Sequence, residues 1–172
     1  LNEAERPEQA IAVWNDLVRR GFVESEAMDL ASLKVVENPD FVFPIPQLFR
    51  GFAWYTARQP GVFVTQSPHA LRYELTGSEP EAFEFLWKRV PITGGKPMRL
   101  VWDADTTRLE KFGLSGSGIT FNIEERPGSG GRQCPALTAQ GKGSCDVTLQ
   151  PGTKGVRLSL RYQRPVGGTR LK

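Results

Sequence analysis

Histidine is almost absent from this chain of 172 residues, since His69 is the only one. A mechanism that activates a serine or cysteine through an imidazole base would have to use it. His69 lies in the turn-like segment 66–69 (QSPH), and the sequence contains no GxSxG motif. We therefore interpret His69 as a turn or surface residue and predict no catalytic residue and no cofactor.

Cysteine is equally scarce, with Cys134 and Cys145 as the only two. Zinc sites commonly take four Cys or His ligands, so these counts disfavour zinc. Two surface cysteines close together in a polar, Gly-rich stretch are more often bonded than free, and disulfides persist in oxidising compartments. We predict a Cys134–Cys145 disulfide and an extracytoplasmic location (periplasm, cell surface or secreted). Unpaired thiols and half of a metal site are the alternatives.

Long hydrophobic runs are missing as well. No stretch approaches the ~20 apolar residues that cross a bilayer. The chain begins at Leu1 without a signal peptide, so we expect a processed form or a fragment, with any membrane contact made through a segment missing from this chain. The length and the 39% hydrophobic content, with ten Phe and four Trp, predict one soluble domain over residues 1–172.

Charge is unevenly distributed. Residues 126–172 hold nine of the 22 Lys and Arg and one of the 19 Asp and Glu, a net charge of +8, whereas residues 1–125 carry −5. This asymmetry predicts a protein partner or self-assembly through acidic and basic complementarity. The candidate interaction face consists of Arg157, Arg161 and Arg164, and a solvated basic sheet face is the alternative. No aromatics interleave with these arginines, so we predict no nucleic-acid binding.

Helical patterns are concentrated near the start. The stripe Ala10, Trp14, Leu17 and Val18, with Pro7 before it and Gly21 after it, predicts an amphipathic helix over 7–20. Ser25 is a candidate cap for a short helix over 27–30. Ser78 and Glu81 have the spacing of a capping box, which predicts a helix over 79–89 with Phe83, Leu86 and Trp87 or Val90 facing inward.

Strand patterns dominate later. Period-two alternation predicts strands at 71–75, 98–104, 119–123 and 156–163, with shorter ones at 62–65 and 147–149. We expect an α+β fold, with an N-terminal amphipathic helix and a short second helix packed on an antiparallel sheet of about five or six strands. The regions are a helical front (1–37), a mixed middle (38–97) and a β-rich end (98–172).

Two further groups of residues suggest chemistry. Asp103 and Asp105 share one face of a strand end and could hold a hard cation in a small metal-dependent hydrolase, although aspartates that hold a turn explain the pattern equally well. Trp54, Tyr55 and Trp102, if exposed, could bind a ligand in a periplasmic ligand- or glycan-binding module. Core packing is the more common role of such aromatics, and we predict no metal site.

The segment 8–22 (EQAIAVWNDLVRRGF) resembles a stretch of some type IV pilins and pseudopilins, in which an acidic start, a Trp, a Leu and a Gly close a short helix. The order of a helical front, antiparallel strands and a cysteine-bounded loop also resembles that family. The resemblance implies a subunit of a surface filament or secretion system. Our prediction is a non-enzymatic, extracytoplasmic protein-interaction domain of this kind.

Overall fold

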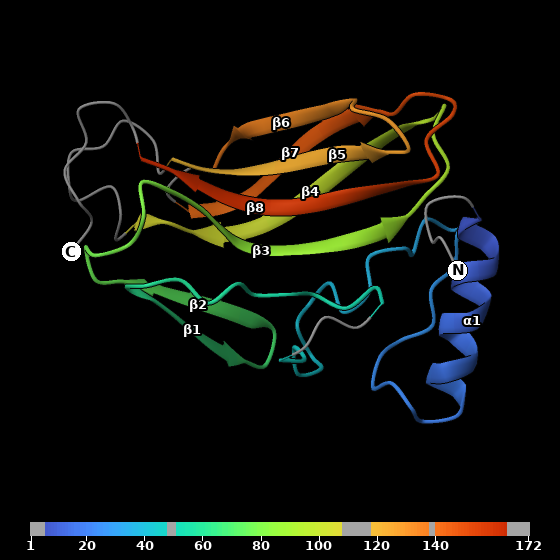
Figure 1. Ribbon diagram of the computed structural model, residues 1–172, viewed down its shortest axis with the longest axis horizontal. Helices are drawn as coiled ribbons and strands as arrows, with labels where there is room; N and C mark the ends of the chain where they lie inside the picture. Colours follow the sequence, from blue (N-terminus) through green and yellow to red (C-terminus); the bar gives the residue numbers. More distant parts are fainter. Residues whose placement is uncertain (1–5, 48–50, 108–117, 138–139, 165–172) are drawn as a thin grey trace.

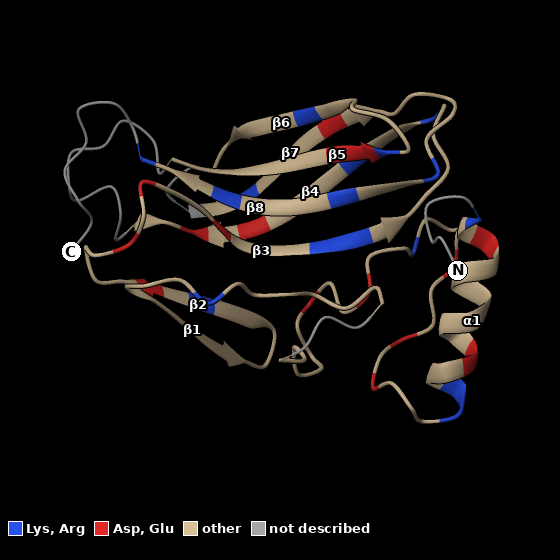
Figure 2. Ribbon diagram, in the orientation of Figure 1, with Lys and Arg blue, Asp and Glu red and all other residues tan. Residues whose placement is uncertain are grey.

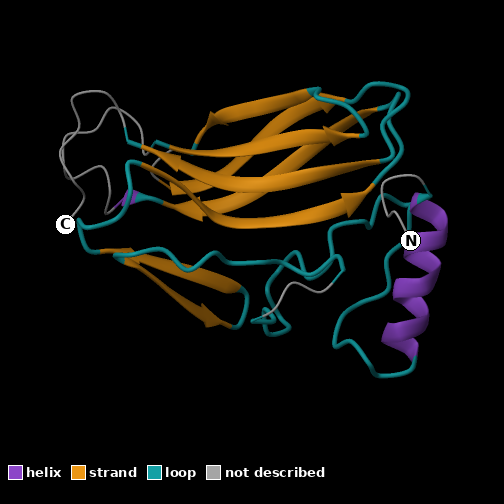
Figure 3. Ribbon diagram, viewed as in Figure 1, coloured by secondary structure: helices purple, strands orange, loops and turns teal. Residues whose placement is uncertain are grey.

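The computed structural model describes residues 6–47, 51–107, 118–137 and 140–164, which are mostly β (Figure 1). These residues form one α-helix, α1 (Pro7–Arg19), and eight strands: β1 (Val62–Ser67), β2 (Ala70–Leu75), β3 (Ala82–Pro91), β4 (Pro97–Asp105), β5 (Ile119–Arg126), β6 (Gly131–Ala136), β7 (Gln140–Thr148) and β8 (Gly155–Gln163). The helix lies to one side of the strands (Figure 3). It is not a helix that could cross a membrane.

The N-terminal helix confirms the prediction for 7–20. Pro7 occupies its first turn, where the missing backbone N–H is no loss, and Gly21 follows it at a φ of 74°. The buried side is centred on Pro7, Ile11 and Trp14. Val13, on the same helix, is 48% exposed. The helix therefore packs through one narrow face.

The largest sheet has the antiparallel order β3-β8-β5-β6. Residues opposite each other in neighbouring strands share a face. Leu158 lies opposite Lys88 and Ile123, all three are buried, and we call this side the inner face. Arg157 lies between Arg89 and Glu124 on the other side, which we call the outer face. The register confirms the predicted alternation of faces along β8, although Ser159 on the outer face is fully buried.

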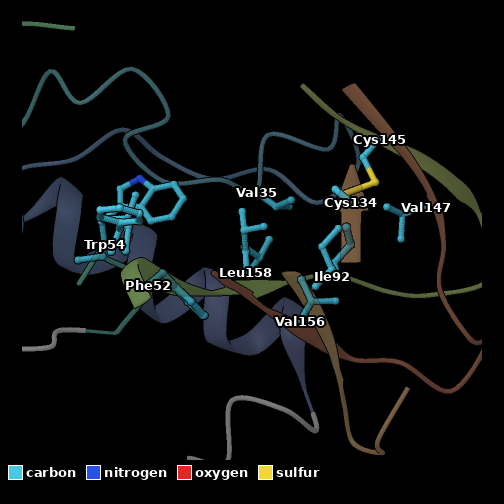
Figure 4. Close-up of a cluster of buried hydrophobic side chains, with 14 of the residues drawn as sticks. Val35, Phe52, Trp54, Ile92, Cys134, Cys145, Val147, Val156 and Leu158 are labelled. Atoms are coloured by element: carbon cyan, nitrogen blue, oxygen red, sulfur yellow. A yellow bond between two sulfur atoms is a disulfide. The ribbon is translucent and has the colours of Figure 1, made fainter. Parts of the chain in front are cut away.

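The β4–β7 pair lies against the inner face. The rings of Trp102 on β4 and Phe121 on β5 are 5.2 Å apart between centroids. A disulfide between Cys134 on β6 and Cys145 on β7 joins the two layers, with 5.6 Å between the Cα atoms. The predicted bond is confirmed, but its expected surface position is wrong, since both cysteines are buried within the core cluster (Figure 4).

Irregular chain between α1 and β1 covers the rest of the core. Met28, Val35, Phe52 and Trp54 from this segment are all buried. Tyr55 then forms a single antiparallel bridge with Trp87, so the chain briefly extends the sheet at the free edge of β3. The segment is held to β3 by backbone pairing as well as by apolar packing.

The predicted α+β fold is wrong, because the described residues form three sheets of four, two and two strands with one short helix. Most of 79–89, expected as a helix, belongs to β3. A β-bulge between Glu84 and Leu86 adds one residue, so that Phe83 and Leu86 point to the same face three positions apart. The bulge thus gives a strand the apolar spacing of a helix.

Polar residues in the segments expected to be helical hold turns instead. The carboxylate of Glu79 accepts a hydrogen bond from the backbone N–H of Gly77 at 2.7 Å, in the turn that leads to β3. The expected helix over 27–30 is also wrong, because Asp29 forms an antiparallel bridge with Lys34 and its carboxylate holds the intervening turn. Polar residues that can cap a helix stabilise turns here.

Candidate functional site on the outer sheet face

The outer face of the four-stranded sheet brings charged and aromatic side chains from three strands together. Figure 2 shows only basic charged residues on β8, which lies between β3 and β5, and these two strands contain both basic and acidic residues. The charged side chains on this face are Glu84, Arg89, Glu124, Arg126, Arg157 and Arg161. Four arginines against two glutamates leave an excess of two positive charges.

Arg157 is the centre of this arrangement. Its Nη1 and Nη2 atoms donate to the two carboxylate oxygens of Glu84 at 2.6 and 2.5 Å. Its Cζ lies 4.7 Å from the centroid of a Trp87 ring, and Nη1 is 3.9 Å from Glu124 Oε1. Bidentate hydrogen bonds to a carboxylate, together with stacking on an aromatic ring, fix a guanidinium in one orientation.

The ion pair changes the titration of both partners. The hydrogen bonds from Arg157 hold the pKa of Glu84 below its usual range, against the opposing effect of burial. The same bonds raise the pKa of Arg157. Both side chains keep about a fifth of their surface exposed (21% and 23%), so the pair is largely enclosed and still reaches solvent.

Tyr55 extends the site beyond β3. Its ring lies 5.3 Å from the Trp87 ring at an interplanar angle of 53°. The backbones of the two residues exchange hydrogen bonds, Tyr55 N to Trp87 O at 2.8 Å and Trp87 N to Tyr55 O at 2.9 Å. We call Tyr55, Trp87 and Arg157 the aromatic–arginine row; all three are partly exposed.

The predicted basic face of Arg157, Arg161 and Arg164 is only partly assembled. Arg157 and Arg161 share the outer face, and the Arg161 Nε lies 3.7 Å from Glu84 Oε1 with half of its side chain (51%) exposed. Arg164 lies beyond the end of β8, is 12% exposed and pairs with Glu81 at 3.0 Å. The sequence did not reveal that glutamates of β3 and β5 neutralise much of this charge.

Lys88 is the most unusual ionisable group on the inner face. It is fully buried, and its Nζ donates to the backbone carbonyl of Glu37 at 2.6 Å and lies 3.4 Å from the Glu37 carboxylate. The Trp54 ring lies 4.6 Å from Nζ. Burial lowers the pKa of Lys88 to about 7, although Glu37 opposes the shift.

A pocket of about 300 Å³ lies next to this buried pair. Its lining includes Met28, Val36, Glu37 and Asn38, whereas Lys88 does not line it. A perturbed lysine near a pocket is a common mark of a functional site. Here the amine contacts protein groups instead, so we interpret Lys88 as the anchor that holds the irregular segment to β3.

The residues considered as catalytic alternatives lie on different elements of the fold. His69 lies in the loop of the β1–β2 hairpin with a φ of 65°. Asp103 and Asp105 point outward on β4, and Asp105 accepts hydrogen bonds from the backbone N–H and hydroxyl of Thr107. Within the described ranges, no three His, Cys, Asp or Glu side chains are grouped so that they could hold a metal ion.

The three aromatics considered as ligand contacts differ in position. Trp54 is buried, and its indole N–H donates to Asn38 O at 3.1 Å. Trp102 packs between the layers, so only Tyr55 lies on the outer face. Trp87, a candidate inward residue of the expected helix, is its partner there. The sequence could have pointed to this pair only if 82–91 had been recognised as a strand.

The comparisons with known proteins do not extend this description. The chain matches no protein-family model, and neither a curated protein nor a solved structure is significantly similar to it. We therefore infer the function from the geometry of the chain itself.

Proposed function

We propose that the chain is a non-enzymatic protein-interaction domain that works outside the cytoplasm and binds its partner through the outer face. The observation that carries the proposal is the aromatic–arginine row, fixed by Glu84 on a solvent-facing sheet. Trp, Tyr and Arg are the residue types that most often dominate the energy of protein interfaces. A side chain already fixed in its bound orientation loses little entropy on association.

The charge of the outer face favours an acidic partner surface. Arg161 and Arg126 keep about half of their side-chain surface exposed (51% and 48%), beside the more enclosed Arg157. Exposed charges at the rim of an interface mainly guide encounter and orientation, whereas the enclosed aromatic residues hold the complex together. We expect affinity to depend on Trp87 and association rate on Arg161.

The extracytoplasmic location is supported by the buried Cys134–Cys145 disulfide that joins the two layers. Disulfides persist in oxidising compartments and are rare in the cytosol. The narrower role as a pilin-like subunit rests on the resemblance of segment 8–22 and stays a prediction. A prepilin-type leader followed by a long apolar helix in the upstream sequence would support it, whereas an ordinary signal peptide would favour another secreted role.

Site-specific photo-crosslinking tests the proposal. A benzophenone amino acid placed at Arg161 should give a discrete protein adduct in the cells that produce the chain. The same group at Val101, which is 60% exposed on β4, is the matched control and should give none. Trp87→Ala combined with the Arg161 probe should weaken the adduct. Equal adducts from both positions, or no protein adduct from Arg161, would contradict the proposal.

A further inference from the structure

Strand β1 has an open edge. Its residues Val62–Ser67 pair with β2 along their whole length, and within the described parts of the chain no second strand pairs with β1. Figure 1 shows β1 at the outer margin of the molecule, away from the other sheets. An edge strand presents unpaired backbone N–H and C=O groups, which are a template for another strand.

The free edges of β3, β6 and β4 carry features that discourage such pairing. The free edge of β3 is covered in part by the Tyr55 bridge. β6 contains Arg132 and Pro135, and β4 contains Pro97 as well as charged side chains. Proteins use Pro, charge and covering segments in this way against edge-to-edge association. The sequence of β1, VFVTQS, has no charged residue and no proline.

Exposed apolar side chains accompany this open edge. Phe63 is 61% exposed and Val64 is 43% exposed. Val64 lies opposite Tyr73 of β2, whose ring packs on Phe85 at 4.7 Å between centroids. A strand added beyond β1 would therefore cover the open side of Val64 and extend the apolar layer that Tyr73 begins.

We propose that β1 pairs antiparallel with β1 of a second copy of this chain, which makes a continuous sheet in the order β2-β1-β1-β2. An antiparallel pair of identical strands is self-complementary about a two-fold axis. The two strands have the same length because they are the same segment of two identical chains. VFVTQS contains no charged residue, so no charge repulsion arises across the axis. The Gln66 side chain donates hydrogen bonds to Phe41 O and Phe43 O and accepts one from Ile45 N. These bonds hold the end of the strand in place for pairing.

The dimer should be weak. Two paired strands of six residues bury less surface than the roughly 1,200–2,000 Å² typical of stable interfaces. The contact uses β1, whereas the proposed partner site lies on β3, β5 and β8, so each can fail without the other. A dimer through β1 would carry two outer faces and could raise the avidity for a repetitive partner.

Sedimentation velocity tests the proposal on the full chain, over protein concentrations from about 10 μM to about 1 mM. We expect the wild type to shift from monomer to dimer over this range. Val64→Lys should stay monomeric, because a charge on the edge would be buried by pairing, and Val101→Lys should dimerise like the wild type. Amide hydrogen exchange should slow within 63–67 in the concentrated wild-type sample only.

Three outcomes would overturn the proposal. A wild type that stays monomeric up to the highest concentration has no self-pairing edge. A dimer that survives Val64→Lys uses another surface. A dimer whose formation leaves exchange within 63–67 unchanged does not pair through β1. The melting temperature of Val64→Lys checks that the variant is folded, and the exchange measurement needs no variant.

Discussion

Arg157 binds both carboxylate oxygens of Glu84, at 2.6 and 2.5 Å, across 73 positions of sequence. The pair joins β3 to the neighbouring strand β8 and at the same time fixes the guanidinium over Trp87. One interaction therefore orders the candidate site and ties two strands together. Both roles can be tested through the titration of Glu84.

Glu84→Gln should lower the free energy of unfolding by about 1–2 kcal/mol at pH 7, because a charge-assisted hydrogen-bond pair is lost. The folded pKa of Glu84 lies below the ordinary 4.5, so its stabilisation is complete above 4.5 and is lost as the pH falls through the folded pKa. The gap between wild type and variant should therefore close on acidification. Urea unfolding at pH 7 and pH 3 measures it.

Glu74→Gln is the control for that experiment. Glu74 also pairs with an arginine, Arg72, but both side chains are more than half exposed (57% and 60%). Such exposed pairs contribute little to the free energy of unfolding. A Glu84→Gln gap that is the same at pH 3 and pH 7 would show that its carboxylate charge does not stabilise the fold.

Lys88 should make the stability of the fold depend on pH in the neutral to alkaline range. Folded Lys88 loses its proton near pH 7, whereas an unfolded lysine keeps it until about 10.5. The unfolded chain thus binds more protons between these values, and stability should rise with pH. From pH 7 to pH 9 we expect a gain of roughly 2 kcal/mol that Lys88→Met lacks. Unfolding at both pH values tests this, and a flat wild type would contradict it.

Leu158 and Arg161 test the two faces of β8. Leu158→Ala should cost on the order of 2–5 kcal/mol, because Leu158 is 4% exposed and its loss leaves a cavity. Arg161→Ala should cost little, since half of its side chain (51%) is exposed. Denaturant unfolding compares them. Similar large losses would mean that the outer face is covered, which would leave no site there.

The disulfide can be tested chemically. The unreduced, denatured protein should contain no free thiol. Replacing Cys134 and Cys145 together by Ala should cost roughly 2–3 kcal/mol, because the bond closes a loop with a sequence separation of 11. Two free thiols would remove the main support for an extracytoplasmic location.

The sequence was informative where a strand keeps strict alternation. The inward Leu158 and outward Arg157 of β8 could be assigned from period two alone, as could the outward Asp103 of β4. The helix 7–19 was equally readable, because Pro7 and Gly21 mark its ends. In these segments local pattern and tertiary environment agree.

The sequence was misleading where non-local pairing decides the structure. The bulge between Glu84 and Leu86 disrupts the alternation of β3 and creates a helical spacing. From its residue type, Lys88 would be expected at the surface. It is instead enclosed by Glu37 and Trp54, which precede it by 51 and 34 positions. The Glu84–Arg157 pair became visible only once β3 and β8 were adjacent.

The most direct test of the account measures affinity for the protein captured by the probe at Arg161. Trp87→Ala should weaken binding about 30-fold or more, the loss of roughly 2 kcal/mol that marks a dominant interface residue. Trp87→Phe should restore part of the affinity, and the exposed Val101→Ala on β4 should bind like the wild type. A folded Trp87→Ala variant that binds as tightly as the wild type would contradict the assignment of the outer face as the partner site.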